Sequence, residues 1–146
     1  MLKTVGVIIV AIAAITAGFK KSVSLKEKNE FLRQMSQFAR YSGEQIRFFR
    51  TDTSAIIASG IKKFPLLRFL ENGKTSFRTF GFSKEVSEFM EMLGTSDTEG
   101  QINLCERYRV YFEGEFSKSS VTCESQGKAY KMLGALGSAA VIILFL

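Results

Sequence analysis

Two uncharged apolar blocks, residues 5–19 and 132–146, constrain the fold of this chain more than any other feature. The first block, with Thr4, is long enough for about 24 Å of helix, which is somewhat less than the hydrocarbon core of a bilayer. Lys3 and Lys20 flank it and can extend their charges to the headgroups on either side. The second block reaches about 27 Å when Ala129 and Tyr130 are included, and Tyr130 suits a membrane interface. Each block therefore predicts a transmembrane helix.

The first block also fits a cleaved signal peptide. Lys3 would supply the charged start, and Ala11 and Ala13 would form a cleavage site of small residues. In that reading the rest of the chain is an extracytoplasmic domain tethered by its C-terminal tail. The second block favours an uncleaved anchor, because two membrane helices make a simple hairpin.

Charges beside the two blocks predict the orientation. Residues 20–28 carry four lysines, whereas Lys3 alone precedes the first block. Lys128 and Lys131 precede the second block, and no charged side chain follows it. Positive residues are retained in the cytoplasm, so residues 20–131 are expected there and both termini on the far side. The sequence thus divides into an N-terminal transmembrane helix at 1–19, a cytoplasmic domain at 20–131 and a C-terminal transmembrane helix at 132–146.

The charge is uneven along the chain. Residues 1–78 hold fourteen Lys and Arg against five Asp and Glu, and residues 79–146 hold six against nine. Attraction to anionic lipid headgroups accounts for the basic half, and no motif for nucleic-acid binding accompanies it. We therefore expect membrane lipids as partners and no nucleic acid.

The central segment has helical periodicity and a single proline, Pro65, which favours an all-α fold. From residue 22 to 51, apolar residues recur at steps of three and four, at Leu25, Leu32, Met35, Phe38, Ala39, Ile46 and Phe49. The opposite face carries Arg33, Arg40, Arg47 and Arg50. Such a basic face is usually solvated, although it also suits lipid headgroups or an acidic partner.

Shorter elements are expected next. Two short helices are predicted at residues 53–63 and 65–71, followed by a loop at 71–81. Ser83 is expected to cap another helix, which buries Val86 and Phe89 and ends near Gly94. The fold expected is a small helical bundle between two transmembrane helices.

A corner then joins this helix to the last one. Gly94 suits a left-handed position after a helix, and Ser96 with Glu99 forms a capping box for the next helix. Asp97 places negative charge in its first turn, and capping does not explain Gln101. We expect this corner to be structural first, with a partner contact as the alternative role of the same residues. The apolar face of this helix is formed by Ile102, Cys105, Arg109, Phe112, Phe116, Ser119, Cys123 and Tyr130. No residue breaks the helix before Leu146, so it is able to continue into the membrane.

Residues for common chemistry are missing. The chain has no histidine, and its two cysteines, Cys105 and Cys123, are separated by about 27 Å of helix, which is too far for a disulfide. Zinc sites, catalytic triads and phosphate-binding glycine loops cannot be built from these residues. We expect no enzyme, no metal, no cofactor and no small-molecule substrate.

The chain resembles a known family in its motifs. These are LGTSDTEGQ at residues 93–101, KMLGALG at 131–137, the opening MLK with GFK at 18–20, and EQIRF at 44–48. Together they resemble the stage III sporulation protein AB family of endospore formers.

That resemblance implies a bundle like the cytoplasmic domains of inner-membrane platform proteins in type II secretion and type IV pilus machines. It also implies a place in the complex joining mother cell and forespore. The expected partners are other membrane proteins of the complex and a secretion-type cytoplasmic ATPase. The expected function is a scaffold, and the alternative is a platform protein that acts outside sporulation.

Overall fold

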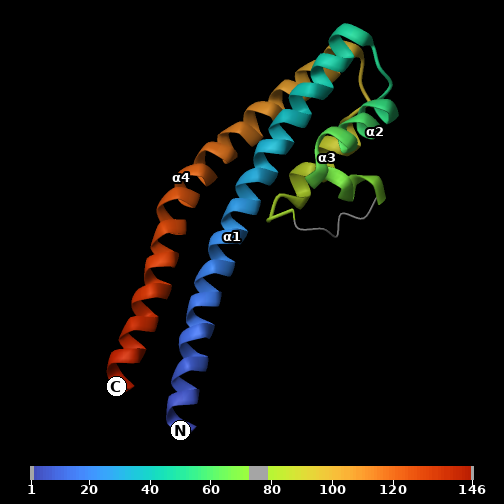
Figure 1. Ribbon diagram of the computed structural model, residues 1–146. Coiled ribbons are helices and arrows are strands. Elements are labelled where there is room, and N and C mark those ends of the chain that lie inside the picture. The colour runs from blue at the N-terminus through green and yellow to red at the C-terminus, as the bar shows by residue number, and fades with distance from the viewer. Residues whose placement is uncertain (1, 73–78, 146) are drawn as a thin grey trace. The chain divides into compact units, whose positions relative to one another are not determined.

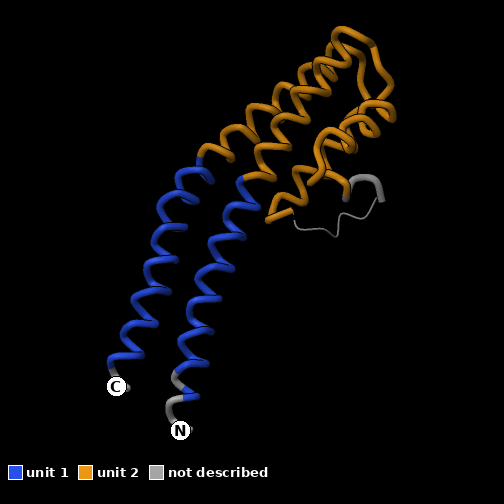
Figure 2. Tube along the Cα trace, viewed as in Figure 1, with its two compact units in different colours: residues 1–29, 118–146 blue, residues 30–117 orange. Residues whose placement is uncertain are grey.

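All regular structure in the described residues, 2–72 and 79–145, is helical in the computed structural model (Figure 1). The elements are α1 (Leu2–Glu44), a π-helical turn (Gln45–Phe49), α2 (Thr53–Lys63), a 3-10 helix (Pro65–Asn72), α3 (Ser83–Met92) and α4 (Thr98–Phe145). The all-α fold is confirmed, and α4 is a single unbroken helix from Thr98 to Phe145. The chain divides into two compact units (Figure 2). We call residues 1–29 with 118–146 the terminal unit and Glu30–Ser117 the central unit.

The short elements largely follow the sequence pattern. The bounds of α2 are those predicted, whereas the element that begins at Pro65 is a 3-10 helix. Ser83 is the first residue of α3 rather than its cap. The cap position belongs to Phe82, and no side chain bonds to the helix there, so the predicted serine cap is wrong. Most of the predicted loop, residues 73–78, lies outside the described residues.

The core of the central unit is rich in aromatic rings. Phe38 is fully buried, with its ring edge-on to Phe64 at 6.2 Å and to Phe89 at 6.1 Å between centroids. Gly60 makes room for it, because a Cβ at Gly60 would lie 2.3 Å from the Phe38 ring. The buried core residues come from all the helices of the unit: Phe31, Leu32, Met35, Phe38, Ala39, Ile46, Ile56, Phe64, Leu67, Val86, Phe89, Leu93, Leu104, Cys105, Tyr108 and Phe112.

The predicted apolar face is confirmed within α1, but it is wrong at the end of the π-helical turn that follows. Leu32, Met35 and Phe38 are fully buried. Phe49, three residues after buried Ile46, is 69% exposed. A π-helical turn closes its hydrogen bonds five residues apart instead of four, so the residue three positions on no longer returns to the same face.

In the terminal unit, the first part of α1 and the last part of α4 run side by side (Figure 1). Small residues lie between them. Ala11 and Ser22 are buried, and a Cβ at Gly18 would lie 2.8 Å from the carbonyl oxygen of Tyr130. The large side chains point outward and are exposed, among them Val5, Ile8, Ile9, Val10, Ile12, Phe19, Met132, Leu133, Leu136, Ile142 and Ile143.

Helix α1 is long and apolar enough to cross a membrane over part of its length. Only 11% of that apolar window is buried, whereas the core helix of a soluble protein is mostly buried. Within the described residues, α4 does not pass the same test of length and composition. The second transmembrane helix therefore stays a prediction.

Candidate interaction site on the central unit

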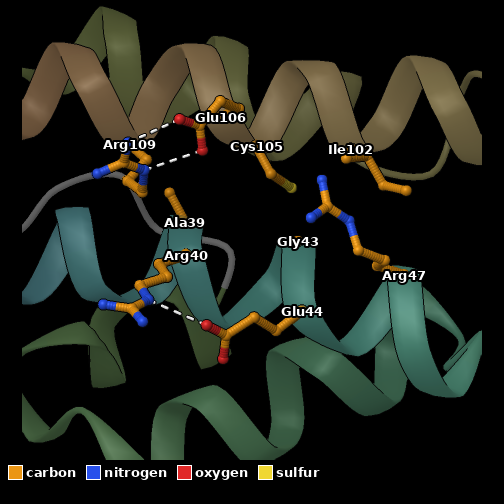
Figure 3. Close-up of a pocket in the computed structure, with 9 residues that line it drawn as sticks. All are labelled: Ala39, Arg40, Gly43, Glu44, Arg47, Ile102, Cys105, Glu106 and Arg109. Atoms are coloured by element: carbon orange, nitrogen blue, oxygen red, sulfur yellow. Dashed lines mark hydrogen bonds and ion pairs between the residues drawn. The ribbon is translucent and has the colours of Figure 1, made fainter.

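A groove of about 190 Å³ lies between α1 with its π-helical turn and α4 in the central unit (Figure 3). One side is formed by Ala39, Arg40, Gly43, Glu44 and Arg47, and the other by Ile102, Cys105, Glu106 and Arg109. Both sets recur at steps of three and four, so each set forms one face of its helix. The groove is therefore a product of helix packing, lined mainly by charged side chains.

Gly43 sets the width of the groove at its floor. A Cβ at Gly43 would lie 3.2 Å from the Cβ of Cys105, which is closer than most side-chain carbons approach. A larger residue would therefore push the two helices apart. Helix α1 ends one residue after Gly43, at Glu44, where the π-helical turn begins.

Ion pairs within each helix hold most of the charges. Arg40 donates from Nε to Glu44 Oε1 at 2.9 Å. Arg109 donates from Nε to Glu106 Oε2 at 2.9 Å and from NH1 to Glu113 Oε2 at 2.6 Å. The hydrogen bonds from Arg109 lower the pKa of Glu106, and Glu106 in turn raises the pKa of Arg109. Both groups therefore stay charged at neutral pH.

Cys105 and Arg47 complete the groove. Burial raises the pKa of the Cys105 thiol to about 11, so it is protonated at neutral pH and is a poor nucleophile. The Arg47 guanidinium extends from the π-helical turn toward Cys105 and Ile102 (Figure 3). No described carboxylate lies within ion-pair distance of Arg47. Its charge acts on Glu106 at longer range and, after the hydrogen bonds from Arg109, helps to lower the pKa of that carboxyl.

The predicted basic face does not form one free cationic surface. Arg33 donates from Nε to Glu30 Oε2 at 2.8 Å, which lowers the pKa of Glu30, and Arg40 is bound by Glu44. Arg47 lines the groove, and Arg50 lies beyond the helix in a left-handed conformation. That these arginines face lipid headgroups stays a prediction.

At the corner between α3 and α4, Gly94 has φ of +92°, the left-handed conformation expected of it. Its missing side chain has a second role, because a Cβ there would lie 2.6 Å from the Thr53 hydroxyl oxygen. The corner thus packs against the start of α2. A role for this corner in binding a partner stays a prediction.

The predicted capping box at this corner is wrong by one residue. Helix α4 begins at Thr98, so Asp97 is its N-cap, and Asp97 Oδ1 accepts from the Gly100 amide at 3.1 Å. Gln101, rather than Glu99, reaches back and donates from Nε2 to the Ser96 carbonyl oxygen at 2.8 Å. Gln101 therefore has a local structural role that the sequence reading did not assign.

The family comparison bears on the second half of the chain. Residues 82–146 match the family model described as stage III sporulation protein AB. The family resemblance is confirmed. The match covers α3 and α4, including the whole Gly94–Gln101 corner. No curated protein and no solved structure matches the chain significantly.

Proposed function

We propose that this protein is a non-enzymatic scaffold of the sporulation channel complex between mother cell and forespore. In this proposal two helices cross the membrane, and residues 20–131 lie in the cytoplasm of the mother cell. The central unit binds a cytoplasmic partner and couples it to other membrane proteins. A secretion-type ATPase is the partner that the family resemblance implies.

The packing of the terminal unit is the observation that carries the membrane part of the proposal. Small residues lie between its two helices, and large aliphatic residues face outward. This arrangement is unfavourable in water, because burying each large apolar side chain would contribute about 1.5–3 kcal/mol of stabilising free energy. In lipid the outward side chains contact acyl chains, and small residues let helix backbones approach closely.

The scaffold role is supported by the chemistry of the groove. Arg40 and Arg109 are bound to glutamates, and Cys105 is protonated. These groups are suited to binding and to holding helices together, and none is an activated nucleophile. The family match over residues 82–146 supports a sporulation protein rather than a platform protein of another system.

Thiol accessibility tests the topology. We would replace Cys105 and Cys123, then place single cysteines at Ser24 and at Ser125. Both serines are exposed, and they lie near the two ends of residues 20–131, the segment proposed to be cytoplasmic. Ser22 is unsuitable because it is only 3% exposed. In intact cells, an impermeant thiol reagent is expected to label neither site, and lysis should make both reactive.

Labelling of both sites without lysis would contradict the cytoplasmic assignment. Intact mass of the purified protein separates the remaining alternative, because signal cleavage after Ala13 would remove the first part of α1. A full-length mass together with shielded cysteines supports the proposed topology.

A further inference from the structure

Two adjacent phenylalanines at the end of the π-helical turn are largely exposed. Phe48 and Phe49 are 70% and 69% exposed, more than any other large apolar residue described in the central unit. Single exposed apolar residues are common on protein surfaces, but an adjacent aromatic pair is a concentrated apolar feature. Turns of π-helix are frequent at functional sites, because they redirect side chains away from the regular helical face.

The residue that follows is in an unusual conformation. Arg50 has φ of +47° and ψ of +40°, and its amide donates to the Gln45 carbonyl oxygen. The left-handed conformation costs a residue with a side chain roughly 1–2 kcal/mol, and glycine usually occupies such a position after a helix. This protein has an arginine instead. A strained residue kept at an exposed turn points to a function for its side chain.

Positive charge surrounds the aromatic pair. No carboxylate in the described parts of the chain lies within ion-pair distance of Arg47 or Arg50. The groove carboxylates nearest to Arg47 are already bound, Glu44 by Arg40 and Glu106 by Arg109. Asp52 is the acidic residue nearest to Arg50 in the sequence, and it is exposed at the start of α2. The aromatic pair is therefore flanked by two arginines that form no ion pair with any carboxylate the structure describes, although Arg47 acts on the charge of Glu106 at longer range.

We propose that Arg47, Phe48, Phe49 and Arg50 form a docking surface for an acidic segment of a protein partner. This inference rests on the proposed scaffold function, which requires a partner for the central unit. The partner segment would present carboxylates to the two arginines and an apolar side chain to the phenylalanines. One carboxylate would enter the groove of about 190 Å³ toward Arg47.

A protein segment fits this surface better than a bilayer. Arginine and aromatic residues are enriched at protein interfaces, and the planar guanidinium binds a carboxylate through two parallel hydrogen bonds. Arg47 points into a concave groove, where a single side chain can enter (Figure 3). Tryptophan and tyrosine are the aromatic residues enriched at membrane interfaces, and neither occurs between Gln45 and Asp52.

Photo-crosslinking in sporulating cells tests the proposal on the full chain. A benzophenone amino acid would replace Phe49, and in a control it would replace Val110, which is 54% exposed in α4 of the same unit. Crosslinked peptides would be identified by mass spectrometry. We expect adducts at position 49 with an Asp- and Glu-rich protein segment, at least about tenfold more abundant than adducts at position 110.

Arg50→Gly separates a docking role from a structural one. Glycine relieves the left-handed strain, so the melting temperature should stay level or rise. The crosslink yield at position 49 should nevertheless fall about tenfold, because a charged hydrogen bond to the partner is lost. Arg50→Lys keeps the charge and should retain more of the yield than Arg50→Gly.

Three results would overturn the proposal. Adducts with lipid would show that the surface meets the membrane, and equal yields at positions 49 and 110 would show no selective docking. An undiminished yield in Arg50→Gly would leave the arginine without a role. Failure of the scaffold proposal is a separate result, because the thiol-labelling experiment reports topology whichever protein is crosslinked.

Discussion

The two units of this protein are built from the same kind of helix but distribute side-chain size in opposite ways. The central unit places large rings inside, with Phe38, Phe89 and Phe112 fully buried. The terminal unit places its small residues inside, with Gly18 against the Tyr130 backbone, and leaves its large aliphatic residues outside. Burial of large apolar groups is the main stabilising term only when the surrounding solvent is water.

This difference indicates which solvent each unit suits. In water, a core such as that of the central unit gains free energy in proportion to the apolar area it buries. In lipid, helices gain little by hiding aliphatic side chains, and close backbone packing through small residues takes over.

The largest expected effect is in the central core. Phe112→Ala should lower the free energy of unfolding by about 3–5 kcal/mol, because Phe112 is fully buried among other rings. Leu133→Ala in the terminal unit removes a side chain that is 64% exposed and should change stability by less than about 0.5 kcal/mol. Unfolding of the full chain in mild detergent, followed by circular dichroism, measures both.

A large effect of Leu133→Ala would show that a further helix or a second copy covers the outward face of the terminal unit. A small effect of Phe112→Ala would show that the central core is loosely packed. Either outcome would remove the contrast between the units.

The next effect depends on pH. Burial raises the pKa of Cys105 from 9.0 to about 11, so the folded state holds this proton more tightly than the unfolded chain. Stability from this group is complete below pH 9 and is lost as pH rises toward about 11. A shift of this size corresponds to at most about 3 kcal/mol.

Cys105→Ala should therefore weaken the decline of stability between pH 9 and 11, even though it also removes packing at neutral pH. Tyr108 contributes to the same decline, because burial raises its pKa as well, so some slope should persist in the variant. Parallel stability curves for the two proteins across this range would contradict burial of the thiol.

A third effect tests the close approach in the terminal unit. Gly18→Val should destabilise the helix pair by about 1–3 kcal/mol, since even a Cβ would lie 2.8 Å from the Tyr130 carbonyl oxygen. Gly137→Val is the matched control, because a Cβ at Gly137 has no atom within 4 Å. Thermal unfolding of both variants in detergent measures the difference. Equal melting temperatures would mean that the two helices do not pack through Gly18.

Much of this fold was predictable because local patterns dictate it. The three- and four-residue spacing of apolar residues predicted buried Met35 and Phe38, and turn chemistry predicted the left-handed Gly94. The exposure of Phe49 was not predictable in this way. The π-helical turn spaces its hydrogen bonds five residues apart rather than four, so α-helical periodicity assigned Phe49 to the wrong face.

In the groove, too, contacts within one helix could be predicted from the sequence, whereas contacts between helices could not. Ion pairs such as Arg40 with Glu44 follow from four-residue spacing within one helix. The meeting of Gly43 with Cys105 joins residues far apart in the sequence, and it depends on how α1 and α4 pack. The contact could not be predicted from these two residues, because glycine and cysteine both occur in helices for many other structural reasons.

The smallest effect concerns the cap of α4, where two neighbouring residues compete for one role. Serine and aspartate are both good N-caps, so the sequence alone cannot choose between Ser96 and Asp97. The structure selects Asp97, whose Oδ1 accepts from the Gly100 amide at 3.1 Å. Asp97→Ala should therefore destabilise the central unit by about 1 kcal/mol, which lowers the melting temperature by a few degrees. Ser96→Ala should be nearly silent, because the Ser96 hydroxyl makes no hydrogen bond in the described parts of the chain and only its carbonyl is used, by Gln101. If Ser96→Ala is the costly variant instead, the helix begins one residue earlier in solution and the capping box predicted from the sequence is correct.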